Sequence, residues 1–138
     1  MINLNKFVKK LTTSQCGEDG LLDKIFKELN INSGFFCEFG AGDGILNCNT
    51  AAFVKQGWSG AYIELDQKLF ENLKSLHKNN HNIFLFNSKV SLEIDEKLDD
   101  YLSYTTAPKD FDLLSIDIDG NDLWIWKSLK AVSYTHLR

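Results

Sequence analysis

Apolar residues recur along this chain in two spacings, one typical of helices and one typical of buried strands. Between residues 17 and 29 the apolar side chains fall three or four positions apart, so they line one face of a helix. The next segment, 34–39, is a short apolar run that predicts a strand. The remaining predicted helices are 47–57, 66–79, 93–102 and 121–132, and the remaining predicted strands are 60–65, 82–87 and 111–118.

This regular exchange of strands and helices predicts an α/β fold. Consecutive strands joined through helices are expected to run parallel, with right-handed crossovers. The predicted strands are apolar on both faces, as in a parallel sheet that helices cover on both sides. With 138 residues the chain has room for one domain.

Charge and composition limit the partners of this domain. The net charge is −4 and the lysines are scattered, so we expect no nucleic-acid partner. No apolar run approaches the roughly 18 residues that a membrane span needs, and the first residues lack the apolar stretch of a secretory signal. The three cysteines show no metal-ligand spacing, which favours a reducing compartment, the cytoplasm. Cys37 is expected in the core, and Cys16 and Cys48 flank the candidate site without being expected to be activated thiols.

Three glycines follow the first predicted strand in the pattern acidic-x-Gly-x-Gly-x-Gly, and these residues are the candidate cofactor loop. They are Glu38, Gly40, Ala41, Gly42, Asp43 and Gly44. Glycine is entropically costly, so its repetition predicts a close approach of a ligand to the backbone. The following helix, capped by Asn47 or Asn49, starts three to five residues after Gly44 and not inside the motif. Its positive end therefore does not face a pyrophosphate. S-adenosylmethionine fits such a loop. A purely structural turn and a nicotinamide or flavin site are the alternatives.

Polar residues at the ends of the next two strands extend this site. Glu64 ends the second strand about twenty residues beyond the glycines, where an acidic residue typically accepts hydrogen bonds from ribose hydroxyls. Asp66 is expected to cap the following helix. Asn87 and Ser88 end the third strand and are expected to meet the adenine edge, with a plain turn as the alternative.

An acidic cluster follows the fourth strand, at Asp117, Asp119, Asn121 and Asp122. Strand alternation predicts Asp117 and Asp119 on the same side at the carboxyl edge of the sheet, where open α/β sheets bind ligands. Neighbouring like charges raise a pKa, which suits a general base. We therefore expect Asp117 to touch the cofactor or the acceptor, and Asp119 to act as base or acceptor contact. Helix capping by Asn121 or Asp122, and a magnesium site, are the alternatives, and no metal is expected.

Four stretches in this order resemble class I S-adenosylmethionine-dependent methyltransferases, specifically the FkbM-like family. They are "SQCGEDG" (14–20), "FCEFGAGDGILNCNT" (36–50), "GWSGAYIELD" (57–66) and "DLLSIDIDGNDLWIW" (112–126). The resemblance covers roughly residues 13 to 131. It implies a Rossmann-like doubly wound parallel sheet, here of about four strands in the order 3-2-1-4, and methyl transfer, often to a hydroxyl oxygen.

The same resemblance implies roles for single residues. Glu38 and the three glycines match the cofactor loop, and Glu64 matches the ribose carboxylate. Many relatives carry glutamate where Asp119 stands. The segment that contains Gln15 and Glu18 is implied to fold over the cofactor, although Ser14 could instead cap the first helix with Glu18 in its first turn.

The remaining aromatic and imidazole side chains are expected to be structural. Trp124 and Trp126 have apolar neighbours and are expected in the core rather than stacked on an acceptor. His77, His81 and His136 have no partner at a useful spacing and are expected at the surface.

The last residues, "VSYTHLR", do not continue the preceding helix and resemble a peptide produced by sequencing-adaptor read-through. We expect residues 1–131 to be the N-terminal part of one methyltransferase domain, and 132–138 to be a non-native tail.

The function predicted from these observations is S-adenosylmethionine-dependent O-methylation of a small molecule, a sugar or a lipid. A non-catalytic Rossmann-like binding module and an NAD-dependent oxidoreductase remain the alternatives.

Overall fold

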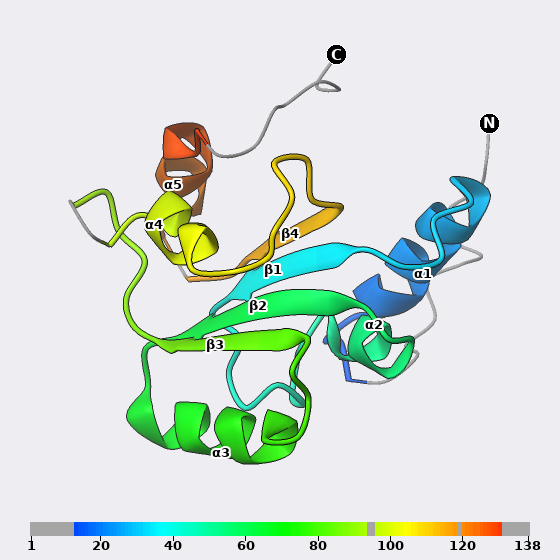
Figure 1. Cartoon of the computed structure of the whole chain (residues 1–138), viewed down its shortest axis with the longest axis horizontal. Helices are drawn as coiled ribbons and strands as arrows, with labels where there is room; N and C mark the ends of the chain where they lie inside the picture. The colour runs from blue at the N-terminus through cyan, green and yellow to red at the C-terminus, as the bar shows by residue number, and fades with distance from the viewer. Residues whose placement is uncertain (1–12, 94–95, 119, 131–138) are drawn as a thin grey trace.

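The computed structural model describes residues 13–93, 96–118 and 120–130, and it contains the nine elements that the pattern predicts (Figure 1). The helices are α1 (Glu18–Glu28), α2 (Ala51–Lys55), α3 (Gln67–His77), α4 (Leu98–Ser103) and α5 (Asp122–Ser128). The strands are β1 (Phe35–Phe39), β2 (Ser59–Glu64), β3 (Ile83–Asn87) and β4 (Leu113–Ile116). Asp119 and residues 131–138, which include the predicted tail, lie outside the described residues.

The four strands form one sheet in the order β3-β2-β1-β4, and every neighbouring pair is parallel. This confirms the predicted α/β fold, its parallel sheet and its 3-2-1-4 strand order. The register pairs Glu38 of β1 with Tyr62 of β2 and with Ser115 of β4. All four strands therefore end at the same edge of the sheet, and the loops that follow them meet there.

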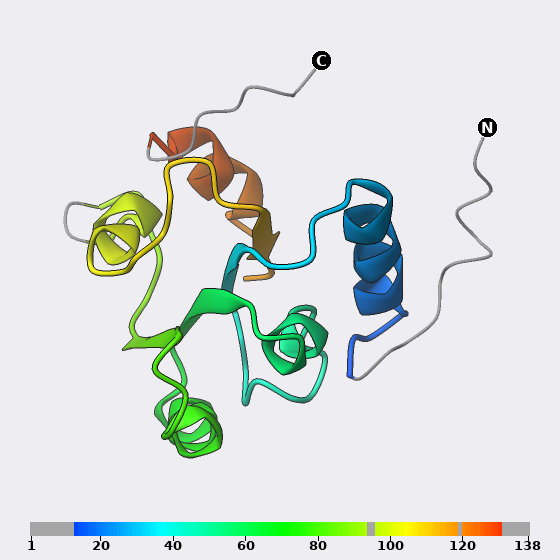
Figure 2. The same cartoon turned by 45° about the vertical axis from the view of Figure 1, so that its right-hand side comes forward.

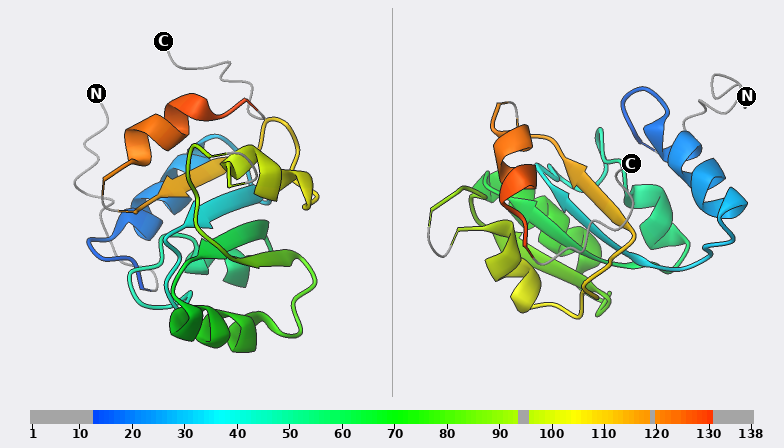
Figure 3. Two further views of the ribbon diagram at one scale, coloured as in Figure 1. Left: turned by 90° about the vertical axis from the view of Figure 1, so that its left-hand side faces the viewer. Right: turned by 90° about the horizontal axis from the view of Figure 1, so that it is seen from above.

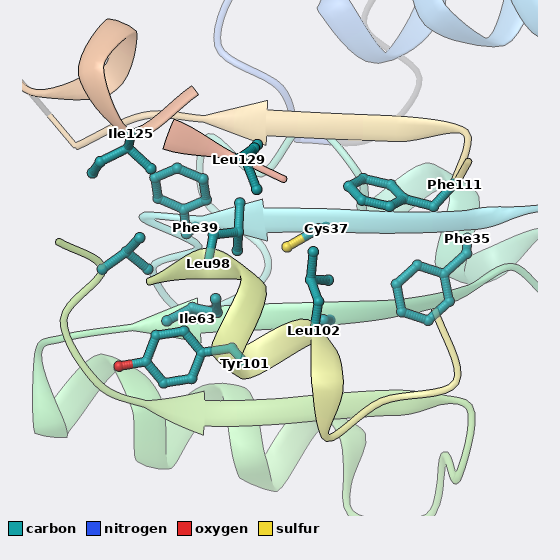
Figure 4. Close-up of a cluster of buried hydrophobic side chains, with 12 residues drawn as sticks. Phe35, Cys37, Phe39, Ile63, Leu98, Tyr101, Leu102, Phe111, Ile125 and Leu129 are labelled. Atoms are coloured by element: carbon teal, nitrogen blue, oxygen red, sulfur yellow. The ribbon is translucent and has the colours of Figure 1, made fainter. Parts of the chain in front are cut away.

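Helices cover both faces of the sheet. Seen along the strands, α4 and α5 lie on one side, and α2 and α3 lie on the other (Figure 2). Because side chains alternate along a strand, β1 contributes Phe35, Cys37 and Phe39 to the first face and Phe36 to the second. On the first face these side chains pack against Leu98, Tyr101 and Leu102 of α4 and against Ile125 of α5 (Figure 4). On the second face the core includes Phe53, Trp58 and Leu73.

Helix α2 is shorter than predicted, and its predicted cap is wrong. The helix begins at Ala51 after Thr50, and neither Asn47 nor Asn49 caps it. Asn47 has a φ of 58° within the loop, and the Asn49 side chain donates to Ser115 Oγ at 3.2 Å. The loop between β1 and α2 is therefore longer than predicted, because the Asn49 side chain binds Ser115 of β4 and does not cap a helix.

The predictions for two other helix starts have opposite outcomes. Asp66 caps α3 as predicted, since its Oδ1 accepts from Leu69 N at 2.9 Å. Ser14 does not cap α1, because Gly17 occupies the N-cap position with a φ of 93°. The buried Ser14 hydroxyl donates instead to Asp19 Oδ1 at 2.6 Å.

Two predictions of burial are also wrong. Trp124 is 58% exposed, because the short α5 turns Ile125 towards the sheet and Trp124 away from it, whereas Trp126 packs against the core as predicted. His77 was expected at the surface but is only 8% exposed. It follows Leu73 by four residues, so it shares the buried face of α3.

Candidate functional site

A hollow of about 360 Å³ lies at the edge where the strands end. The left panel of Figure 3 faces this edge of the molecule. The hollow is bordered by residues at or just beyond the ends of all four strands: Phe39, Gly40, Ile63, Glu64, Leu65, Ser88, Lys89, Val90, Asp117, Ile118 and Asn121. We call it the edge hollow. Four of the predicted site residues, Gly40, Glu64, Ser88 and Asp117, therefore border one space.

Glu64 joins the second strand to the glycine loop. Its Oε2 accepts a hydrogen bond from Gly42 N at 2.7 Å, and its Oε1 accepts one from Asp66 N at 2.7 Å. The side chain is only 8% exposed yet borders the edge hollow. A carboxylate offers about four lone pairs, so these two bonds leave acceptor capacity on the side of the hollow.

The three loop glycines differ in what an added Cβ would meet. Gly40 has a φ of +75°, and a Cβ there would lie 1.9 Å from the carbonyl oxygen of Asp117. Gly44 also has a φ of +75°, and a Cβ there would lie 2.5 Å from Leu73 Cδ1. At Gly42, with a φ of +60°, the nearest atom would be 3.9 Å away. Only Gly42 therefore has open space beside it, while the chain itself closely approaches Gly40 and Gly44.

Glu38 is not among the residues that border the edge hollow. It is 3% exposed, and Oε2 accepts from Thr50 Oγ1 at 2.6 Å while Oε1 accepts from Asn49 N at 3.0 Å. Further donors are Thr50 N at 3.3 Å, Cys48 Sγ at 3.2 Å and Ser115 Oγ at 3.3 Å. The first residue of the glycine motif thus anchors the loop between β1 and α2 beneath the site.

The other two loop residues serve the loop backbone. Ala41 is 2% exposed and packs in the second core. Asp43 Oδ1 accepts from Ile45 N at 2.9 Å and from Leu46 N at 2.8 Å, which closes a turn. Gln15 is exposed and is not among the residues that border the edge hollow.

The end of β3 brings Ser88, but not the Asn87 side chain, to the hollow. Asn87 Nδ2 donates to the Glu64 carbonyl oxygen at 2.9 Å, so its amide holds the β2 end. Ser88 Oγ lies 2.6 Å from Tyr101 Oη, which donates to the Lys89 carbonyl oxygen at 2.7 Å. Lys89 itself borders the hollow. One lysine after a strand has no distinctive pattern, so the presence of this cation at the site could not be predicted from the sequence.

Asp117 and Asp122 have separate roles beyond β4. Asp117 is exposed and borders the hollow, and it follows the strand, which ends at Ile116. Asp122 accepts from Ile118 N at 2.9 Å and from Gly120 N at 3.0 Å. These backbone bonds lower the pKa of the Asp122 carboxyl. Asp122 therefore fixes the turn into α5, and the Asn121 side chain makes no cap bond although it borders the hollow.

Within the described residues, no group of three histidine, cysteine, aspartate or glutamate side chains is arranged to hold a metal ion. Nor does any described helix have the length and apolar character to cross a membrane.

The three cysteines differ in exposure, and this difference predicts their reactivity. Cys16 is exposed, whereas Cys37 and Cys48 are buried. Burial raises the pKa of the Cys48 thiol to about 12 and also raises that of Cys37. At pH 8 we expect Cys16 to react with a disulfide reagent and the other two to react more than about 1,000-fold more slowly, since the thiolate is the nucleophile. Counting released chromophore over time, with Cys16→Ser as control, tests this. Two fast thiols in the native chain would contradict it.

Among known proteins, a similarity is found with a solved structure but with no family model or curated protein. Among solved structures, the chain is similar to the crystal structure of a proposed RNA methyltransferase from Pyrococcus horikoshii, with a TM-score of 0.45 and 12% sequence identity. The alignment covers 88% of this chain and 60% of that one, so this chain spans less than two thirds of that protein.

Proposed function

We propose that this chain is the cofactor-binding part of an S-adenosylmethionine-dependent methyltransferase similar to the FkbM-like family. Its acceptor would be a hydroxyl oxygen of a small molecule, a sugar or a lipid, and the enzyme would act in the cytoplasm. When bound, S-adenosylmethionine supplies a methyl group on a positively charged sulfur. Transfer is a simple displacement, so the task of the protein is to align donor and acceptor.

One observation carries this proposal: the Glu64 carboxylate meets the glycine loop beside the edge hollow. The 2.7 Å bond from Gly42 N brings an acidic strand end and a glycine turn together across 22 residues of sequence. A dinucleotide-type site needs the same pair, because the acid holds ribose hydroxyls while the loop leaves room along the backbone. The hollow, at about 360 Å³, falls in the size range of ligand pockets.

The residues present fit this cofactor. Glu64 retains lone pairs for two hydroxyl donors after binding the Gly42 and Asp66 amides. The open side of Gly42 leaves the loop backbone accessible. Ser88 is the better candidate for the adenine edge at the end of β3, because the amide of Asn87 is already engaged with main-chain carbonyls.

In this proposal, the residues after β4 form the side of the site that faces the methyl acceptor. Asp117 borders the hollow from the strand next to β1, so we propose that it contacts the methionine end of the cofactor or the acceptor. Asp119, proposed as base, is two residues further along the chain. A net charge of −4 argues against a nucleic-acid acceptor.

The start of α2 favours this cofactor over a nicotinamide. A pyrophosphate is normally bound at the N-terminus of the helix that follows the glycines. Here α2 begins only at Ala51 and is five residues long, whereas Gly44 ends the motif. The loop therefore lacks the helix end that a dinucleotide pyrophosphate uses. An NAD-dependent oxidoreductase remains the second candidate, and a non-catalytic binding module the third.

Calorimetric titration of the chain tests the proposal. S-adenosylmethionine and its demethylated product are expected to bind, and NAD is expected neither to bind nor to compete. Gly42→Val should weaken binding more than about tenfold, because the branched side chain would fill the open space beside the loop and disturb the Gly42 amide bond to Glu64.

Gly57→Val is the matched control. Gly57 also has a positive φ, of 87°, with nothing within 4 Å of an added Cβ, and it lies after α2 away from the hollow. The Gly57→Val variant has the same kind of backbone strain but does not alter the site. It should therefore bind S-adenosylmethionine as tightly as the unmodified chain does. Equal losses of affinity for S-adenosylmethionine in the two variants would show that the glycine loop is not part of the binding site. Competition by NAD would favour the oxidoreductase, and heat from no nucleotide would favour the binding module.

A further inference from the structure

A second cavity, with a volume of about 320 Å³, lies between the end of the glycine loop, α2 and α3. We call it the rear cavity. Most of its wall is apolar, formed by Gly44, Ile45, Ala51, Val54 and Leu76. Lys55 and Asn80 add polar groups to its border. The proposed cofactor site does not use this space.

His77 gives the rear cavity a buried polar group without a partner. The residue is 8% exposed and borders the cavity. Its ring stacks on Tyr62, with centroids 5.4 Å apart and planes inclined by 23°. Its Nε2 is buried and has no hydrogen-bond partner among the described residues. A Cβ added to Gly44 would lie 3.5 Å from this atom, so Nε2 is located at the cavity wall beside the loop.

A second such atom borders the same space. Thr13 Oγ1 is buried and, like His77 Nε2, lacks a partner in the described part of the chain. Native proteins pair nearly all buried polar groups, so two unpaired ones at one apolar cavity require an explanation. Burial lowers the pKa of His77, and a neutral imidazole has one nitrogen that accepts a hydrogen bond. A hydroxyl group could donate to that nitrogen and accept from the threonine.

The volume indicates the size of the occupant. A dry cavity of about 150 Å³ accepts one benzene ring, and the rear cavity has about twice that volume. We propose that the rear cavity is a binding site for a two-ring apolar molecule that carries a hydroxyl group, with His77 Nε2 and Thr13 Oγ1 as its hydrogen-bond partners. This site is separate from the edge hollow and does not depend on the proposed methyl transfer.

Titration of the isotope-labelled chain, followed by NMR, tests this proposal with 2-naphthol and naphthalene as probes. We expect 2-naphthol to shift the amide signals of Gly44, Val54 and Leu76, and to bind about tenfold more tightly than naphthalene, as net hydrogen bonds to two buried groups allow. His77→Phe keeps the ring and its stacking but removes Nε2. In this variant the ratio of the two affinities should fall to about twofold or less.

His81→Phe is the matched control, since it makes the same substitution at an exposed histidine that does not border the cavity. It should keep the tenfold ratio. Should His77→Phe fail to fold, Thr13→Val removes the other partner and is expected to lower the ratio as well. Val54→Trp, which fills the cavity, should abolish binding of both probes. Failure of 2-naphthol to bind the folded chain, or a ratio that the histidine and threonine variants leave unchanged, would overturn the proposal.

Discussion

Gly40→Ala is expected to prevent the chain from completing its sheet. The added Cβ would lie 1.9 Å from the carbonyl oxygen of Asp117 and 2.9 Å from its carbonyl carbon. Both are backbone atoms, so no side-chain movement relieves the overlap. Gly40 N also donates to the Ile63 carbonyl oxygen at 3.1 Å, and Asp117 N donates to that of Phe39 at 3.2 Å. Moving either strand end away would break these bonds between β1 and its two neighbours.

The matched control for Gly40→Ala is Gly57→Ala, which isolates the conformational part of the effect. Both glycines have positive φ, 75° and 87°, but Gly57 has open space around its Cα. We expect Gly57→Ala to lower the free energy of unfolding by about 1 to 2 kcal/mol, the cost of the left-handed conformation. Gly40→Ala should cost more than about 4 kcal/mol, which is most of the stability of a small domain. Urea unfolding measures both, and equal losses would contradict the backbone overlap.

The location of the glycine loop was predictable from sequence, but the reason for each glycine was not. The motif predicts a close approach to the backbone, and the approach is real. At Gly40 and Gly44, however, the approaching atoms belong to Asp117, which follows β4, and to Leu73 of α3. Sequence alone cannot reveal this, because those atoms come from segments 29 or more residues away. Only at Gly42 does the space stay open, as a ligand would need.

The helices and strands were predictable because each has one apolar face or one apolar run. The errors arose where a short element could not bury every apolar residue. "DLWIW" places Leu123, Trp124, Ile125 and Trp126 in succession, and a helix turns only part of such a run inwards. Conversely, a polar residue at helical spacing was overlooked. His77 follows Leu73 by one turn, and this spacing was the signal of its burial.

The partners of the acidic residues were the least predictable part of the site. Sequence position showed that Glu38 and Glu64 lie at the ends of neighbouring strands, but not that Glu64 borders the edge hollow while Glu38 does not. Glu64 belongs to the edge hollow, and Glu38 belongs to the interior beneath the loop. The two carboxylates lie on the same face of the sheet, since Glu38 is paired with Tyr62 and Glu64 follows Tyr62 by two residues. The difference arises from the hydrogen-bond donors that the loop brings to Glu38 after its turn.

Glu38→Ala is therefore expected to act mainly on stability. The buried carboxylate accepts from the Asn49 and Thr50 amides and from the Thr50, Ser115 and Cys48 side chains. Its removal leaves these donors unpaired in a space that also holds the buried Tyr62, whose hydroxyl lies 2.8 Å from Thr50 Oγ1. Since each orphaned buried donor is costly, we expect a loss of about 3 to 5 kcal/mol in the free energy of unfolding.

Glu38→Gln and Glu28→Ala separate charge, shape and surface effects in this prediction. Glutamine keeps the volume but presents an amide NH₂ to groups that are themselves donors, so an intermediate loss of about 2 kcal/mol is expected. Glu28 is exposed and pairs with Lys24, so its removal should leave the urea midpoint unchanged. If Glu38→Ala kept full stability and lost only affinity for S-adenosylmethionine, the acid would be a direct cofactor contact. The carboxylate would then have to leave its five donors, because it does not border the edge hollow while it holds the loop.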